Sequence, residues 1–313
     1  MRTAFIEELI QQARTNPRIF LVVGDLGYSV VESFANEFPD RFLNAGVAEQ
    51  NMTGMAAGLA AEGYHVFTYS IANFPTFRCF EQIRNDVAYH ELPVTIVAVG
   101  GGMSYGNLGY SHHAVQDLAV MRCLPQVLIV APGDPLETRA VVEWLVAHPQ
   151  PSYLRLGKAG EPTLHTARPA LAPGRLVPVF GEEQEGTFVT TGATLRYALE
   201  AARHPALEGR WAVHSLPLWG ERWKAEVARE LARFPQVISV EDHLAAGGFG
   251  SYLREAMETA PSPARLRSVA LDPAACGLVG KQDTLNAAGG LTVAALVDTA
   301  KCGTISPGNA CRL

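Results

Sequence analysis

The sequence predicts an α/β protein built from two doubly wound α/β/α domains. Short apolar, β-branched runs alternate with helical patterns along most of the chain, and one Pro- and Gly-rich segment interrupts this alternation. Strands that alternate with helices form a parallel sheet that helices cover on both faces. A length of 313 residues also suits about two domains. We therefore expect a first domain over 1–160, a linker over 161–185 and a second domain over 186–313.

The first domain opens with MRTAFIEELIQQARTN (1–16), an amphipathic helical pattern. Buried strands are then expected from four short apolar runs: IFLVV (19–23), HVFTY (65–69), VTIVAV (94–99) and VLIVA (127–131). Helical patterns lie between these runs, at about 48–62, 78–91, 113–122 and 134–147. PSYLRL (151–156) is expected to form the last strand of this domain.

The segment that follows is rich in Pro and Gly and has no helical period, so it predicts a linker with an edge strand at most. A second, smaller alternation comes next, with strands expected at 187–192, 211–216 and 237–241 and helices at 193–203, 222–233 and 248–259. The last residues, GTISPGNACRL (303–313), have no pattern and are expected to be loose.

Composition excludes several classes of protein. The net charge is −6 without a Lys/Arg cluster, so nucleic acid is not an expected partner. No apolar run reaches the ~20 residues of a membrane span, and the N-terminus lacks a signal-peptide core. The cysteines are odd in number and show no metal-ligand spacing, so we expect reduced thiols, no metal site and a cytoplasmic location. They are Cys79, Cys123, Cys276, Cys302 and Cys311.

The most informative segment is RFLNAGVAEQNMTGMAAG (41–58). A short apolar run leads into a Gly-bounded turn, and Glu49 and Gln50 then lie in the first turn of a helix rich in small residues. A carboxylate there is stabilised by the helix N-terminus. One interpretation is structural: Gly46 or Asn44 opens the helix and Glu49 reaches back to a free N–H.

This segment resembles the pyrimidine-binding segment of thiamine-diphosphate enzymes, specifically the transketolase and deoxyxylulose-phosphate synthase group. In that family the matching Glu hydrogen-bonds N1′ of the aminopyrimidine. This contact favours the imino tautomer, which takes the proton from the thiazolium C2 and leaves the ylid. The resemblance therefore implies that Glu49 binds the cofactor and acts in catalysis.

A glycine-rich loop, GGMSYGNLGYSHH (101–113), lies between an expected strand and an expected helix that His112 and His113 open. Ligands of open α/β sheets bind at the carboxyl ends of strands, although a long surface turn would look alike. The loop resembles the family's loop ending Gly-Pro-Thr-His-Gln, so His112 is implied to handle a substrate proton. Beside it, His113 and Asn107 are candidate substrate contacts. The family carries Asp where this chain has Leu108, so we expect an unusual substrate, such as a modified or nucleotide-linked sugar.

The segment ANFPTFRCFEQIRNDVAYHELPV (72–94) extends the resemblance. The family places an aromatic ring against the pyrimidine, shortly before an Arg and an aromatic-acid-Gln run. Arg78 and the run that begins at Phe80 match, which implies Phe74 as the stacking ring, with Phe77 in reserve. Simple packing in the core is the alternative for both rings.

Four further residues carry weaker signals. Asp25 matches an acidic position near the thiazolium, but it is otherwise a turn former. Lys158 falls where the family uses an Arg for substrate phosphate, and Arg2 could take a similar role. His243 is interpreted as structural or as part of a subunit contact.

One family motif is missing. Thiamine-diphosphate enzymes hold the diphosphate through Mg²⁺ with Gly-Asp-Gly and a later Asn, and the nearest approach here, Gly24-Asp25-Leu26-Gly27, opens the wrong domain. The resemblance covers about 1–300, which corresponds to the last two domains of a three-domain transketolase. It implies a separate diphosphate-binding subunit that holds most of the Mg²⁺, in a heterotetramer with two copies of each chain.

The function implied is transfer of a two-carbon ketol or acyl unit between sugar-type substrates through a thiamine-bound carbanion. Two alternatives use the same cofactor: the β subunit of a 2-oxo-acid dehydrogenase, and a condensing enzyme like deoxyxylulose-phosphate synthase. A third is a regulatory subunit that keeps the fold without the chemistry. Neither HExxH nor GxSxG occurs, which disfavours a zinc hydrolase or a serine hydrolase.

Overall fold

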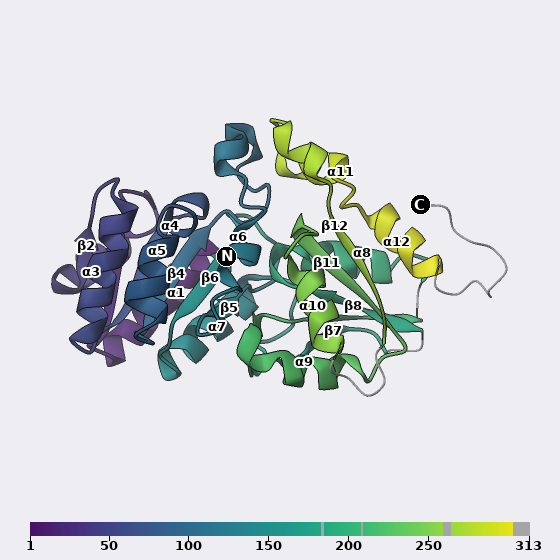
Figure 1. The fold of residues 1–313 in the computed structure, drawn as a ribbon, viewed down its shortest axis with the longest axis horizontal. Helices are drawn as coiled ribbons and strands as arrows, with labels where there is room; N and C mark the ends of the chain where they lie inside the picture. The colour runs from purple at the N-terminus through teal and green to yellow at the C-terminus, as the bar shows by residue number, and fades with distance from the viewer. Residues whose placement is uncertain (183–184, 208, 259–263, 303–313) are drawn as a thin grey trace.

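The structure is a computed structural model that describes residues 1–182, 185–207, 209–258 and 264–302. Two sheets lie side by side along the long axis of the molecule (Figure 1). The larger has the strand order β10-β5-β6-β4-β3-β1-β2, and the smaller has the order β12-β11-β8-β9-β7. Most neighbouring strands are parallel and helices cover both sheets, so the predicted fold class is confirmed.

The larger sheet holds β1 (Ile19–Val23), β2 (Phe42–Asn44), β3 (His65–Ile71), β4 (Val94–Val99), β5 (Leu128–Val130), β6 (Ser152–Leu156) and β10 (Leu218–Trp219). Its helices are α1 (Arg2–Thr15), α2 (Glu32–Glu37), α3 (Glu49–Ala61), α4 (Asn73–Thr76), α5 (Phe80–Gln82), α6 (Asp117–Met121) and α7 (Pro135–Ala147). Side chains alternate between its two faces, as the pleat of a strand requires. In β4, Ile96 and Ala98 belong to an apolar cluster that includes residues of α3 and α6, whereas Val97 and Val99 belong to one that includes residues of α1 and α7.

The smaller sheet holds β7 (Val177–Phe180), β8 (Gly186–Thr190), β9 (Trp211–Ser215), β11 (Gln236–Leu244) and β12 (Arg265–Leu271). Its helices are α8 (Leu195–Ala202), α9 (Lys224–Leu231), α10 (Phe249–Met257), α11 (Gln282–Ala288) and α12 (Val293–Lys301). β7 lies within the predicted linker, and it pairs antiparallel with β9 as the edge strand that was expected there. The tail 303–313, expected to be loose, lies outside the described residues.

One expectation for the first sheet was wrong. The strand at 151–156 is not its last, because β10 returns from the second half of the chain and pairs antiparallel with β5. The helix expected over 78–91 is found over 80–88, and its type changes along its length. A short α-helix, α5, passes into a π-helical segment over Ile83–Ala88. Segments of this kind are often found at functional sites.

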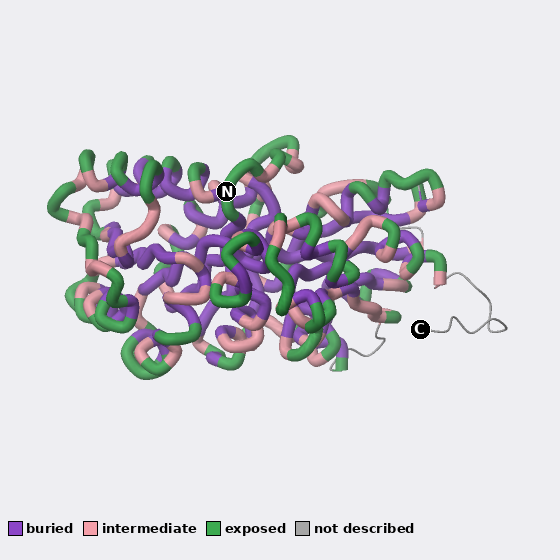
Figure 2. The backbone as a smooth tube through the Cα atoms, turned by 90° about the horizontal axis from the view of Figure 1, so that it is seen from above, coloured by how far each residue is buried: buried purple, intermediate pink, exposed green. Residues whose placement is uncertain are grey.

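One apolar cluster extends across the two halves. Trp219 of β10 is fully buried and packs on Phe249 and Tyr252 of α10, in a cluster that also includes residues of α3 and β4. Figure 2 shows buried segments in both halves and across the middle of the molecule, with exposed segments mostly along its outer edges. None of the helices within the described ranges combines the length and the apolar character needed to cross a bilayer.

Candidate active site

Four loops of the first domain converge at the carboxyl ends of neighbouring parallel strands. Asp25 follows β1, Glu49 follows β2, Phe74 follows β3 and His112 follows β4. Because these strands run in one direction, their carboxyl ends form one edge of the sheet, where open α/β folds bind ligands. The three sequence segments singled out above are therefore brought to one place.

Glu49 is the first residue of α3 and is 2% exposed. Its Oε2 accepts a hydrogen bond from Arg78 Nη1 at 3.0 Å. The helix begins after Ala48 without a side-chain cap. In the turn before it, the side-chain oxygen of Asn44 accepts a hydrogen bond from the backbone N–H of Gly46 at 2.9 Å. Glu49 therefore does not have the capping role that the structural interpretation gave it.

Space beside Glu49 is kept open by Gly24. A Cβ at this glycine would lie 3.4 Å from Glu49 Cγ and 3.5 Å from the hydroxyl of Ser70. That hydroxyl is buried and has no hydrogen-bond partner among the described residues. A buried carboxylate and a free buried hydroxyl beside a glycine form a polar surface that can accept a ligand.

Phe74 lies between a cation and an imidazole. The guanidinium carbon of Arg78 is 4.8 Å from the centroid of the Phe74 ring, and the His112 ring meets the same ring edge-on at 5.3 Å. Gln50 Nε2 donates to the carbonyl of Arg78 at 3.0 Å, which joins α3 to this segment. Phe77 is more exposed than Phe74. Arg78 thus contacts both Glu49 and Phe74.

His112 does not open a helix, and that expectation was wrong. It ends a 3₁₀ turn over Tyr110–His112, and α6 begins only at Asp117. Its Nδ1 lies 3.0 Å from the hydroxyl of Ser111. Partial burial, and then the neighbouring His113, lower the pKa of His112. The ring is therefore neutral at neutral pH and can accept a proton.

The residues around His112 differ in accessibility. The His113 ring is buried, with Nε2 3.5 Å from the carbonyl of Gly106, and its own carbonyl accepts from Asn73 at 3.1 Å. Asn107 and Leu108 are exposed on the outer side of the loop. His113 thus supports the loop from inside, whereas Asn107 faces solvent.

Arg2 and Lys158 meet around a tyrosine that the sequence did not single out. Lys158 Nζ is 5.2 Å from the ring centroid of Tyr105. Arg2 and Tyr105 both line a cavity of about 210 Å³, together with Tyr28 and Tyr69. Arg2 Nε is buried and has no partner among the described residues. Two cationic side chains and several phenols thus lie next to the His112 loop, a chemistry suited to an oxygen-rich anion.

The signal in the sequence that is connected with Tyr105 is the glycine at position 100, at the end of the preceding strand. Gly100 has φ +88° and a Cβ there would lie 2.1 Å from the Tyr105 ring. Only a glycine allows both that conformation and that contact.

Asp25 is held in a turn with φ +56°, which is uncommon for a residue other than glycine. Asn44 Nδ2 donates to its carboxylate at 2.9 Å, and Asn44 Oδ1 accepts from its backbone N–H at 3.2 Å. This pair joins the ends of β1 and β2. Asp25 is therefore fixed at the edge of the site by a local contact, as its turn-forming interpretation expects.

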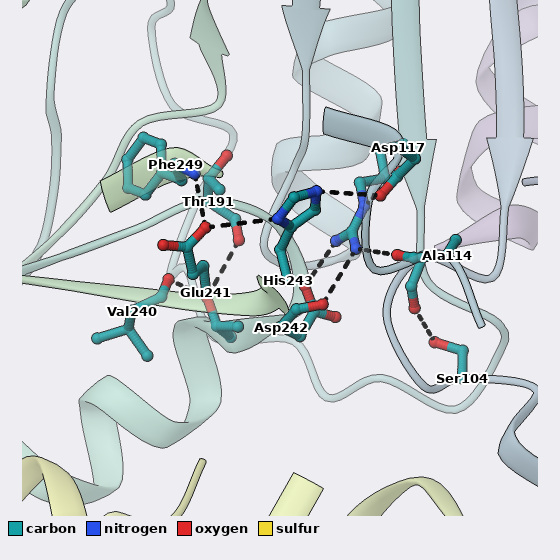
Figure 3. Close-up of polar contacts among 12 residues, drawn as sticks. Ser104, Ala114, Asp117, Thr191, Val240, Glu241, Asp242, His243 and Phe249 are labelled. Carbon is teal, nitrogen blue, oxygen red and sulfur yellow. Dashed lines mark hydrogen bonds and ion pairs between the residues drawn. The ribbon is translucent and has the colours of Figure 1, made fainter. Parts of the chain in front are cut away.

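A buried ionic network lies beneath the His112 loop (Figure 3). Arg155 donates through Nε to Asp117 at 2.8 Å and through Nη1 to Asp242 at 2.6 Å. His243 is fully buried beside Asp117, with their nearest side-chain atoms 3.9 Å apart. His243 is thus enclosed among buried side chains, and whether its role is structural or at a subunit contact stays a prediction.

This region gives a pH prediction. Burial raises the pKa of Glu241 to about 8, although its carboxylate accepts N–H groups of Phe249 and Gly250. The folded state therefore binds a proton that the unfolded chain releases near its ordinary pKa of 4.5. This extra proton makes a contribution to the free energy of unfolding that is fully present below pH 4.5. The contribution is lost as the pH rises from 4.5 through 8, by at most about 1.4 kcal/mol per pH unit.

We expect the thermal midpoint to fall between pH 5 and 8.5, and to fall less steeply in Glu241→Gln. Burial also raises the pKa of Glu137 to about 7, so Glu137→Gln is expected to remove a second part of the slope. Calorimetric unfolding across this range measures both. Equal slopes in the wild type and in Glu241→Gln would contradict the role of Glu241.

Residues 1–160, which contain this site, match the family model described as transketolase, pyrimidine binding domain. The chain belongs to the transketolase family, whose members depend on thiamine diphosphate. This confirms the family that the sequence resembled.

Two relatives and one solved structure are similar over nearly their whole length. One subunit of apulose-4-phosphate transketolase from Phocaeicola vulgatus is 33% identical over 270 residues, which cover 85% of this chain and 86% of the relative. The 6-deoxy-6-sulfo-D-fructose transketolase subunit SqwH from Clostridium sp. (strain MSTE9) is 31% identical over 306 residues, 96% of this chain and 93% of the relative. A split gene transketolase solved as an inactive beta4 tetramer is 33% identical with a TM-score of 0.83, covering 96% of this chain and 97% of that one.

All three are separate subunits rather than whole transketolases. The prediction that this chain corresponds to the C-terminal subunit of a split transketolase-like transferase is confirmed. The roles of the individual site residues are proposed below.

Proposed function

We propose that this chain is the subunit of a split transketolase-like enzyme that transfers a two-carbon ketol or acyl unit between sugar-type substrates. Its active form is proposed to contain two copies of this chain and two of a diphosphate-binding partner, which holds most of the Mg²⁺. The observation that carries the proposal is the chain of contacts in a domain of this family: Arg78 joins Glu49 to Phe74, and the His112 ring lies against Phe74.

The residues present fit the pyrimidine end of thiamine diphosphate. When bound, this cofactor supplies the carbanion that carries the transferred unit. Glu49 would share a proton with N1′ of the pyrimidine, because its carboxyl group lies at this edge of the sheet and is shielded from solvent. Phe74 would offer its ring face to the pyrimidine, and Arg78 would lie beside both.

His112 is proposed to move a proton at a substrate oxygen. Its neutral ring can accept a proton in one step and return it in another, and it lies next to Phe74 and therefore next to the proposed cofactor position. His113 is proposed to act through the loop, because its ring is buried. Asn107 and Asp25 are proposed as outer contacts to substrate and cofactor.

The substrate is proposed to carry an anionic end that Lys158 and Arg2 bind. Two observations support this: both cations surround Tyr105, and the two relatives are named for a phosphorylated sugar and a sulfonated sugar. The ammonium group of Lys158 acts as a point charge, whereas the guanidinium of an Arg would donate two parallel hydrogen bonds to the anion. Leu108, in place of an acidic residue, is proposed to relax the requirement for a particular hydroxyl group.

Replacing Lys158 by Met is expected to raise KM for the anionic substrate about tenfold or more while kcat changes little, because a charge-assisted hydrogen bond contributes about 1.5–3 kcal/mol. Lys158→Arg should retain most of the affinity. Steady-state kinetics of the mixed subunits measures this. Arg254, exposed on α10 in the second domain, provides the control variant Arg254→Met. An equal effect of both Met variants would contradict a substrate contact at Lys158.

The function itself is tested by mixing the chain with a diphosphate-binding transketolase subunit, thiamine diphosphate and Mg²⁺. Turnover of a ketose is expected in the mixture and not with this chain alone. Turnover by the chain alone would contradict the split-subunit proposal. Turnover of pyruvate in place of a ketose donor would instead favour the condensing enzyme.

A further inference from the structure

The His112 loop is closed at its base by a single backbone bridge. Gly102 N donates to the carbonyl of Ala114 at 2.9 Å, and Ala114 N donates to the carbonyl of Gly102 at 3.0 Å. The loop between these residues therefore leaves the first sheet and returns at one point. The conformation of the loop therefore depends on the contacts that residues 103–113 make with other parts of the protein.

Beneath this base lies the second domain. The carbonyl of Ala114 also accepts from Arg155 Nη2 at 3.0 Å, and Arg155 is bonded to Asp242 of β11. A Cβ at Gly102 would lie 2.3 Å from Asp242 Oδ2, so the loop lies directly on this carboxylate. Figure 3 shows Ala114, Asp117 and Asp242 around this point.

The side of the loop is held by α11. Gly106 packs against Leu285, whose Cδ1 would lie only 2.3 Å from a Cβ at this glycine, and Gly280 N donates to the Gly106 carbonyl at 3.2 Å. Leu285 is 2% exposed. Figure 1 shows α11 beside the loop, above the two sheets. Met103, next to the base, is fully buried in the apolar cluster of the second domain, which includes Leu285.

A run of tight turns connects Gly106 to His112. Gly109 N donates to the carbonyl of Gly106 at 3.2 Å, and His112 N donates to the carbonyl of Gly109 at 2.9 Å. The exposed residues between them contribute little packing of their own. A displacement at Gly106 is therefore passed along the hydrogen-bonded turns to the imidazole.

We propose that Leu285 is a positioning residue for His112, through which the second domain sets the conformation of the His112 loop. The contact at Gly106 fixes the loop from the side, and Asp242 fixes it from below. The importance of this for catalysis rests on the proposed function, whereas the mechanical coupling does not. The second domain thus takes part in the active site without contributing a side chain to it.

The test compares Leu285→Ala with Leu296→Ala. Leu296 lies in α12, is fully buried and belongs to the same apolar cluster, and the loop contacts described above do not include it. Both changes create a cavity in the same core, so their costs in stability are of one kind. Hydrogen exchange of the backbone amides of residues 105–113, in the chain alone, is the readout.

Leu285→Ala is expected to speed this exchange about tenfold or more, because local opening is no longer opposed by the Gly106 contact. Leu296→Ala should leave the exchange at the wild-type rate. Equal exchange in the two variants would overturn the proposal. Should Leu285→Ala not fold, Gly106→Ala tests the contact between the loop and this segment, because its added methyl group would lie 2.3 Å from Leu285 Cδ1 and 2.8 Å from the Gly280 carbonyl and is expected to speed the exchange too.

A second readout uses the mixed subunits. Leu285→Ala is expected to lower kcat several-fold with little change in the affinity for thiamine diphosphate, whereas Leu296→Ala should change neither. An inactive wild-type mixture would count against the proposed function alone, since the exchange experiment still decides whether Leu285 holds the loop. Unchanged kcat in Leu285→Ala, despite faster exchange, would overturn the catalytic part of the inference.

Discussion

Replacing Glu49 by Gln is expected to lower kcat of the mixed subunits about 10²–10⁴-fold, the usual contribution of a positioned general acid or base. Gln preserves the size of the side chain and one acceptor oxygen, but it cannot share a proton with the pyrimidine. Since Glu49 is buried and paired with Arg78, no bulk water can replace it. Steady-state kinetics with saturating thiamine diphosphate measures the loss.

The control is Glu62→Gln, at the exposed C-terminal end of the same helix. This variant should retain wild-type turnover, because Glu62 lies outside the site. A loss of less than tenfold in Glu49→Gln, with the cofactor bound, would mean that another group activates the cofactor.

Arg155→Met is expected to lower the free energy of unfolding by about 3–5 kcal/mol, because it leaves two buried carboxylates without a cation. Asp117 and Asp242 are both bonded to this guanidinium, and all three side chains are at most 3% exposed. The change should also loosen the base of the His112 loop. Chemical denaturation at pH 7, monitored by far-UV circular dichroism, measures the loss of stability.

Arg84→Met serves as the comparison. Arg84 pairs with Glu81 on the surface, where both side chains are more than half exposed. Pairs of this kind contribute about 0–1 kcal/mol. If the two variants were equally stable, the network beneath the loop would not have the role given to it here.

Most of the long parallel strands of the first sheet were predictable because each is a short, largely apolar run. β1 and β4 have the bounds expected, and β3 is two residues longer. The strands that were missed have weak local signals. β10 has only two residues and pairs through a partner far away in the sequence, and β12 (Arg265–Leu271) is a partly exposed edge strand with two Arg in seven residues.

The sequence could indicate candidate residues of the site, but it could not predict the contacts that fix their positions. Glu49, Phe74 and His112 lie in segments with unusual composition, and the parallel sheet brings those segments to one edge. The helix expected from His113 onward fails because Gly102 and Ala114 pair instead, and the chain turns until Asp117. The contacts of Arg155 with Asp242 and of Gly106 with Leu285 join residues far apart in the sequence, so no local pattern could predict them.

The measurement that tests the central claim most directly is calorimetric titration of thiamine diphosphate with Mg²⁺ into this chain, alone and mixed with a diphosphate-binding transketolase subunit. Our account predicts tight binding in the mixture only, because this chain provides the pyrimidine end of a site that two subunits share. Tight binding to the isolated chain, or no binding in either case, would contradict it.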